Sequence, residues 1–155
     1  MSKKRSFSIG ILLPRYGEDI PTLFQAAEAY GASQVYAVGS TWSANSLPFS
    51  KQRKERHYPP YSYYEYFEDF QAQHLGDGRQ LVLVDPSPTD QASEPIEHFE
   101  HPDYATYLFL GRDAALPKKM PADTLYVHVA GSERLSPGGS GAILMYDRTL
   151  RLEAR

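Results

Sequence analysis

Apolar residues in this chain fall into short runs that alternate with amphipathic stretches. Several runs continue without polar alternation, which is typical of strands buried on both faces of a parallel sheet. These runs are Phe7–Leu13, Gln34–Val38, Gln80–Val84, Tyr104–Leu110 and Leu125–Val129. The first two flank a helical pattern, so the N-terminal part predicts a strand–helix–strand unit and therefore a parallel sheet.

Three segments predict helices. The first begins near Asp19, a capping residue type, and ends before Gly31, where a left-handed cap is expected. Its apolar face contains Leu23, Phe24, Ala27 and Tyr30. Residues Tyr63–His74 predict a short helix entered from an extended piece. The last helix is expected from Ser136-Pro137 to about Leu150, and its core-facing stripe is expected to contain Ala142, Ile143, Tyr146 and Leu150. Strands and helices thus alternate in one α/β domain over residues 1–155.

Composition narrows the function classes. The length of 155 residues favours a single domain. The chain has 16 Lys plus Arg and 19 Asp plus Glu, and the resulting net charge of −3 excludes a strongly basic nucleic-acid binder. The charges are segregated, however: Lys51–Arg56 carries a net +3, whereas Asp85–Asp103 contains six acids and no Lys or Arg. The absence of Cys excludes disulfides, thiolate metal sites and Cys nucleophiles.

The N-terminal region does not predict a targeting segment. The apolar run after the basic start ends at Pro14, too early for a secretory signal. No apolar run approaches the ~18 residues of a membrane-spanning helix. We therefore expect a soluble cytoplasmic protein with no membrane partner.

Three segments are candidates for chemistry, each with a structural alternative. The glycine-rich stretch Ser136–Asp147 opens a helix, so its backbone N–H groups could approach an anion, or its small residues could serve close packing. Leu110–Pro117 places Gly111 after a strand, where open α/β sheets bind ligands, but it could also be an ordinary turn. Lys51–His57, followed by several tyrosines, could hold RNA phosphates and stack bases, or be a solvated loop.

A metal site is the weakest candidate. His98 and His101 lie three residues apart beside two glutamates, but Pro102 follows and the neighbouring sequence offers no further ligands. We therefore expect no metal.

Taken together, these segments resemble the SpoU/TrmH branch of the SPOUT methyltransferases. The first family motif reads approximately N-V-G-T-L-F-R-A-A-x-x-F-G-A, and Asp19–Ala32 reads DIPTLFQAAEAYGA. The second resembles H-P-x-x-A-x-Y-L-x-G-x-E-x-x-G-L-P, and His101–Pro117 reads HPDYATYLFLGRDAALP. The third resembles L-N-V-x-V-A-x-A-I-x-L-Y-E/D, and Leu135–Asp147 reads LSPGGSGAILMYD. The resemblance spans nearly the whole chain.

The resemblance implies a single-domain SPOUT (α/β knot) fold with a C-terminal trefoil knot, a homodimer, and S-adenosylmethionine as cofactor. It implies RNA, either tRNA or rRNA, as the substrate of ribose 2′-O-methylation. The positions that correspond to the cofactor site are Val84, Gly111, Val129, Ala130 and Leu135. The basic residues expected to hold RNA are Lys51, Arg53, Lys54 and Arg56.

The departures from the family pattern fall mostly on positions that the resemblance implies to be catalytic. Asp19 stands for the first-motif Asn, and Gln25 for the Arg implied to activate the ribose hydroxyl or to bind phosphate. Asp113 stands for the second-motif Glu, and Ser136 for the third-motif Asn. Residues of the expected core are retained. The catalytic candidates are therefore Asp19, Gln25, Asp113 and Ser136, with altered chemistry at each.

Three functions follow from this pattern. The first is an S-adenosylmethionine-dependent RNA ribose 2′-O-methyltransferase or a divergent relative. The second is a catalytically degenerate SPOUT-fold protein that binds RNA or dimerises, because Gln25 and Ser136 replace polar groups of the site. The third is an unrelated nucleotide-binding α/β protein.

Overall fold

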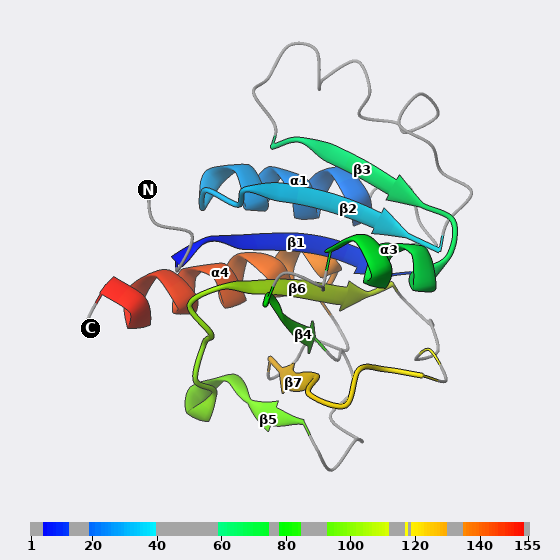
Figure 1. Ribbon diagram of the computed structural model, residues 1–155. Coiled ribbons are helices and arrows are strands. Elements are labelled where there is room, and N and C mark those ends of the chain that lie inside the picture. Colours follow the sequence, from blue (N-terminus) through cyan, green and yellow to red (C-terminus); the bar gives the residue numbers. More distant parts are fainter. Residues whose placement is uncertain are drawn as a thin grey trace.

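A single parallel sheet of seven strands forms the centre of the molecule (Figure 1). The computed structural model describes residues 5–12, 19–39, 59–74, 78–84, 93–111, 117, 119–129 and 135–153. The strands are β1 (Phe7–Leu12), β2 (Gln34–Val38), β3 (Tyr61–Tyr64), β4 (Gln80–Val84), β5 (Glu94–Pro95), β6 (Ala105–Leu110) and β7 (Leu125–His128). Their order in the sheet is β3-β2-β1-β6-β4-β7-β5, and every neighbouring pair is parallel.

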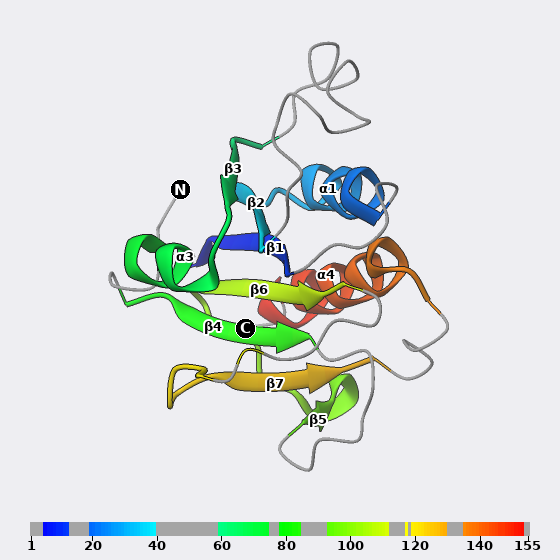
Figure 2. The same cartoon turned by 90° about the vertical axis from the view of Figure 1, so that its right-hand side faces the viewer.

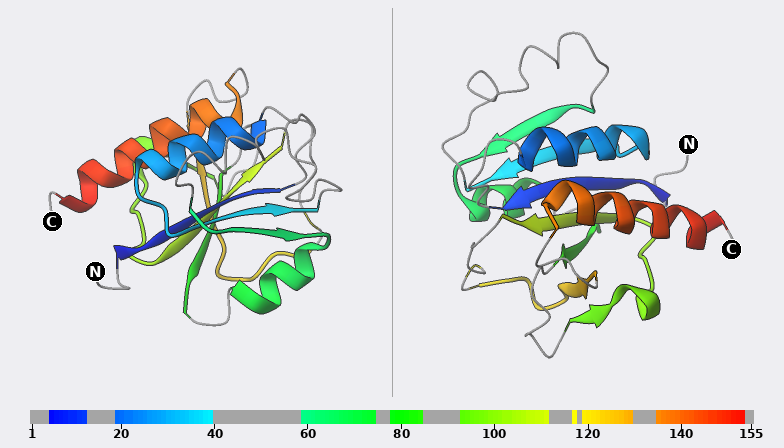
Figure 3. Two further views of the ribbon diagram at one scale, coloured as in Figure 1. Left: turned by 90° about the horizontal axis from the view of Figure 1, so that it is seen from above. Right: turned by 180° about the vertical axis from the view of Figure 1, so that it is seen from behind.

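The helices cover both faces of this sheet. They are α1 (Asp19–Ala29), α3 (Phe67–His74), the short 3-10 helix η2 (Ile96–His98) and α4 (Pro137–Glu153). Helices α1 and α4 lie side by side on one face, and α3 lies on the other (Figures 2 and 3). Both α1 and α4 begin at the edge of the sheet where the strands end, because each follows a strand and runs back across the sheet.

The sheet separates two apolar clusters, which explains why its central strands have no polar alternation. The larger cluster lies under α1 and α4 and includes Ile9, Phe24 and Met145. The smaller lies under α3 and includes Tyr36, Phe70 and Leu108. All six positions of β1 and of β6 are buried, and their apolar residues divide between the clusters: Phe7, Ile9, Ile11, Ala105, Tyr107 and Phe109 belong to the larger, and Leu12, Leu108 and Leu110 to the smaller.

The predicted α/β class, the parallel sheet and all five predicted strands are confirmed, with ends that differ by at most one residue. Two further strands, β3 and β5, form the opposite edges of the sheet. The second helix begins at Phe67 and not at Tyr63 as predicted, and the extended piece expected before it is β3, which includes Tyr63 and Tyr64. The two-residue β5 was not predicted, because a strand this short and rich in polar residues has no hydrophobic pattern.

The predicted core-facing stripe of the last helix is wrong. Ile143, Tyr146 and Leu150 are 43%, 55% and 50% exposed, whereas Leu144, Met145 and Leu152 are buried. The helix has two apolar faces, and periodicity cannot tell which one meets the sheet. The inner face contains Gly138 and Gly141, which allow α4 to approach α1.

Close contact between the two helices explains these glycines. A Cβ added at Gly138 would lie 2.7 Å from Thr22 Cβ, and one added at Gly141 would collide with Leu23. Close packing therefore accounts for Gly138 and Gly141 in the glycine-rich stretch. Within the described part of the chain, no helix is both long and apolar enough to cross a membrane.

Candidate functional site at the carboxyl edge of the sheet

The carboxyl ends of β1, β6, β4 and β7 meet at one edge of the sheet, because these strands are parallel neighbours. Open α/β sheets bind ligands at this edge. The structure brings Val84, Gly111 and Val129 together here, since each stands at the end of β4, β6 or β7. The Gly111 N–H donates to the Leu12 carbonyl at 2.7 Å, which ties the end of β6 to the end of β1.

The remaining predicted cofactor positions are Leu135 and Ala130. Leu135 precedes α4 and is 39% exposed, in contrast to the buried Val84 and Val129. Ala130 lies outside the described residues. The edge thus combines buried strand ends with an exposed apolar side chain just before α4.

Ser136 has a structural task at this edge. Its Oγ accepts a hydrogen bond from the Gly139 N–H at 3.2 Å, which is the arrangement of a helix N-cap. Ser136 is half-buried. Its hydroxyl therefore stabilises the start of α4, whatever else it does.

The other catalytic candidates are in contrasting environments. Asp19, the first residue of α1, is fully buried, whereas Gln25 is exposed on the outer side of α1. Within the described part of the chain, no hydrogen bond joins Gln25 to Ser136 or to Asp19. Asp113 lies outside the described residues. The structure therefore does not assemble Asp19, Gln25 and Ser136 into one bonded group.

The predicted RNA-binding residues Lys51, Arg53, Lys54 and Arg56 also lie outside the described residues. The described segment that follows them, residues 59–74, has exposed acids at Glu65, Glu68 and Asp69 and no Lys or Arg. These carboxylates would repel a phosphate backbone. This surface therefore does not favour contact with a nucleic-acid backbone.

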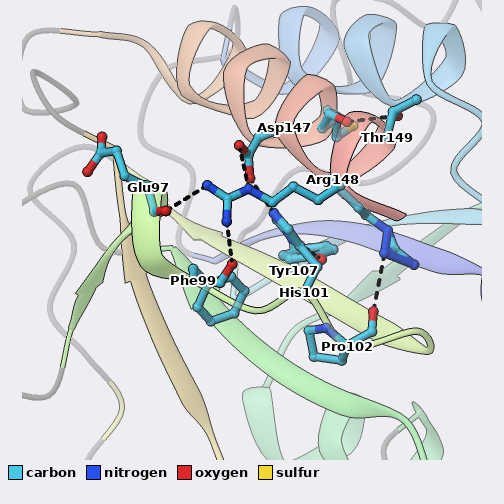
Figure 4. Close-up of polar contacts among 10 residues, drawn as sticks. Glu97, Phe99, His101, Pro102, Tyr107, Asp147, Arg148 and Thr149 are labelled. Carbon is cyan, nitrogen blue, oxygen red and sulfur yellow. Dashed lines mark hydrogen bonds and ion pairs between the residues drawn. The ribbon is translucent and has the colours of Figure 1, made fainter. Parts of the chain in front are cut away.

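A buried polar cluster lies away from the carboxyl edge, between α4 and the segment before β6 (Figure 4). His101 has a fully buried side chain, with Nδ1 2.8 Å from Tyr107 Oη and Nε2 2.7 Å from Asp147 Oδ2. A neutral imidazole satisfies both contacts by accepting from the Tyr107 hydroxyl and donating to the carboxylate. Sequence reasoning considered His101 only as a metal ligand and missed this role, because Asp147 is 46 residues away.

Two arginines of α4 extend the cluster. Arg151 donates to Asp147 Oδ1 at 3.0 Å and to the carbonyls of Glu97 and Phe99. Arg148 donates to the carbonyls of Pro102 and Asp103, and Figure 4 shows the Pro102 contact. We call His101, Tyr107, Asp147, Arg148 and Arg151 the α4 clamp. It fastens the C-terminal half of the helix and therefore contributes to which face α4 turns outward.

The clamp shifts the titration of its histidine. Burial lowers the pKa of His101 from its ordinary value, although the hydrogen bond to Asp147 and the Asp147 charge oppose this. The positive charges of Arg148 and Arg151 lower the pKa further. A buried, neutral imidazole with both nitrogens bonded is a structural group and not an accessible acid or base.

A second polar cluster lies at the amino edge of the sheet. The Arg79 guanidinium donates to the hydroxyls of Tyr36, Tyr104, Ser8 and Thr106 at 2.9–3.4 Å. Arg79 and Tyr104 directly precede β4 and β6, Ser8 and Thr106 are the second residues of β1 and β6, and Tyr36 is the third residue of β2. The cluster closes the end of the sheet opposite to the candidate ligand edge.

No protein-family model matches the chain, and no curated protein matches it in sequence. Solved structures match it in fold. An AdoMet-bound rRNA methyltransferase from Sinorhizobium meliloti has a TM-score of 0.78 at 18% identity, over 96% of this chain and 57% of that one. The SpoU methyltransferase AviRb from Streptomyces viridochromogenes, in complex with AdoMet, has a TM-score of 0.74 at 13% identity, over 98% of this chain and 62% of that one.

A structure described as giving insight into the 2-OH methylation of C/U34 on tRNA has a TM-score of 0.75 at 17% identity and covers 98% of this chain and 99% of that one. The chain thus spans about three-fifths of the first two neighbours and nearly the whole of the third. These similarities confirm the predicted fold class, that of the SpoU/TrmH methyltransferases.

Proposed function

We propose that the protein is an S-adenosylmethionine-dependent methyltransferase that acts on RNA at ribose 2′-hydroxyls. The observation that carries this proposal is the convergence of Val84, Gly111 and Val129 at the carboxyl edge of a sheet whose fold is that of RNA methyltransferases. Three sequence motifs in the order of the SpoU/TrmH family support the same function.

The residues at this edge fit the cofactor. Backbone groups at Val84, Gly111, Val129, Ala130 and Leu135 would hold the adenosine and amino-acid parts, and the exposed Leu135 side chain would cover an apolar surface. When bound, S-adenosylmethionine supplies an electrophilic methyl group on a positively charged sulfur. The protein would act mainly by positioning the reactants: it would hold the acceptor hydroxyl in line with that methyl and exclude water.

The proposal extends to how RNA is held. Lys51, Arg53, Lys54 and Arg56 would contact phosphates, away from the exposed acids of residues 65–69. We place this activity in the cytoplasm, and the trefoil knot implied by the family resemblance would form the cofactor pocket.

The proposal also includes a homodimer. The outward stripe of α4, formed by Ile143, Tyr146 and Leu150, would pack on a second copy, as the family resemblance implies. Its support is the exposure of three large apolar side chains along one helix face. Light scattering of Ile143→Asp/Leu150→Asp should give a monomer where the natural protein gives a dimer. A monomeric natural protein would rule out this part.

The alternative is a SPOUT-fold protein that has lost catalysis. Two observations favour it: Gln25 supplies no charge, and the Ser136 hydroxyl serves as a helix cap. Removing one transition-state contact commonly costs about 10²–10³ in rate, so an Arg-to-Gln difference need not abolish activity. Both functions keep the fold, and they differ in methyl transfer.

Calorimetry and methyl transfer test the proposal together. Titration of folded protein with S-adenosylmethionine should release or absorb heat, and tritiated cofactor should label unmodified tRNA or rRNA transcripts. Absence of binding at millimolar cofactor would reject the methyltransferase. Binding without labelling, with labelling gained by Gln25→Arg/Ser136→Asn, would establish the degenerate alternative.

A further inference from the structure

His128 is the last residue of β7 and lies at the candidate ligand edge, next to Val129. Side chains alternate along a strand, and Val127 belongs to the cluster under α1 and α4. The imidazole of His128 therefore projects from the opposite face of the sheet, the face that α3 covers. Its side chain is half-buried, so solvent and a ligand can reach part of the ring.

The ring of His128 is held in one orientation. Its Nδ1 lies 2.9 Å from Ser93 Oγ, which comes from the segment that leads into β5. Strands β5 and β7 are paired, with Pro95 opposite His128, so the pairing of the two strands fixes the backbone of Ser93 relative to that of His128. Within the described part of the chain, His128 Nε2 has no hydrogen-bond partner. A histidine oriented through one nitrogen and open at the other is the arrangement of a general base.

The other catalytic candidates among the described residues are poor bases. The Gln25 amide does not titrate, Asp19 is fully buried, and Ser136 caps α4. Among the described residues within two positions of Val84, Gly111, Val129 and Leu135, His128 is the one with an imidazole side chain, the group most often used as a general base.

Among the residues that the structure describes, few charged or titratable groups lie around His128. Strand β5 and its approach contribute the Ser93 hydroxyl and the exposed Glu94 carboxylate, and β7 itself contributes Tyr126. The end of β4, on the other side of β7, contributes the apolar Leu83 and Val84. No described acid or base therefore bonds to the ring.

We propose that His128 is the general base of the methyl transfer and that Ser93 is its positioning residue. This inference rests on the proposed function. The acceptor hydroxyl oxygen forms a bond to the methyl carbon as the bond from that carbon to sulfur breaks, and the electron pair of that bond stays on sulfur. The hydroxyl proton passes to His128 Nε2. The products are the methyl ether, neutral S-adenosylhomocysteine and an imidazolium, which releases its proton to water.

The first test measures whether the ring meets the bound cofactor. Histidine ring resonances of the full chain are followed by NMR as S-adenosylmethionine is added, and His128→Asn assigns the relevant signal. The signal of His128 should shift at saturation, while that of the exposed His98, assigned with His98→Asn, should stay in place. A bound cofactor that leaves the His128 signal unmoved overturns the base and leaves the proposed function standing. No cofactor binding at all rejects both.

The second test measures chemistry with tritiated cofactor and unmodified tRNA or rRNA transcripts. His128→Asn should lower kcat by at least about 100-fold with little change in KM, and the acid limb of the pH profile should disappear. Ser93→Ala should lower kcat less, and Ser93→Thr should restore it because the hydroxyl is retained. His98→Asn should match the natural protein. A His128→Asn enzyme with unchanged kcat and an unchanged pH profile refutes the proposal.

Discussion

The Asp147 carboxylate joins two parts of the α4 clamp, and its removal offers a direct measure of the clamp's strength. In Asp147→Ala, the His101 Nε2–H is left buried without its acceptor, at a cost of about 1–3 kcal/mol. The pair with Arg151, one helical turn away and 38% exposed on the arginine side, adds only about 0.3–0.5 kcal/mol. The free energy of unfolding should therefore fall by about 1.3–3.5 kcal/mol.

Urea unfolding followed by circular dichroism checks this value. The midpoint should decrease with an unchanged slope, because the folded state stays equally compact. Asp147→Asn is the conservative control: its amide oxygen can still accept from His101, so the loss should be below about 1 kcal/mol. Glu153→Ala, an exposed acid on the same helix, should change the stability by less than about 0.5 kcal/mol. The reasoning fails if Asp147→Ala is no more destabilising than Glu153→Ala.

Three further predictions concern α4 and the clamp. Gly138→Ala should lower the free energy of unfolding by about 1–3 kcal/mol, because its Cβ would meet Thr22. A Cβ at Gly139 would have its nearest contact at 3.6 Å, so Gly139→Ala should be neutral or stabilising by up to about 1 kcal/mol. Thermal unfolding of the two variants distinguishes these outcomes. Ser136→Ala should cost about 0.5–2 kcal/mol in the same assay by removing the helix cap, and an unchanged midpoint would contradict that role. The pKa of His101 is lowered in the folded state, so the unfolded chain binds more protons and the protein loses stability as pH falls below about 6.5. The difference in free energy of unfolding between the natural protein and His101→Gln should therefore shrink from pH 8 to pH 5. A constant difference would argue against the lowered pKa.

Hydrophobic patterning alone established much of the fold. Strands such as β4 and β6 are buried on both faces, so an uninterrupted apolar run was sufficient to predict them. The first helix was also predictable, since Leu23, Phe24 and Ala27 share a face and do become buried. The placement of Gly111 at the carboxyl edge of the sheet followed from its position after a strand, whereas Val129 was named from the family resemblance.

Tertiary structure decided what depends on contacts between distant segments. Both faces of α4 are apolar, so packing against α1 through Gly138 and Gly141, together with the α4 clamp, determines that Ile143 and Tyr146 point outward. Likewise, β5 has no hydrophobic pattern and exists because β7 offers it a hydrogen-bonding edge. His101 becomes a buried, neutral group because Asp147 and Tyr107 meet it from α4 and β6. A local sequence pattern reports the period of one segment, whereas orientation and burial are set by the neighbours that the fold brings to it.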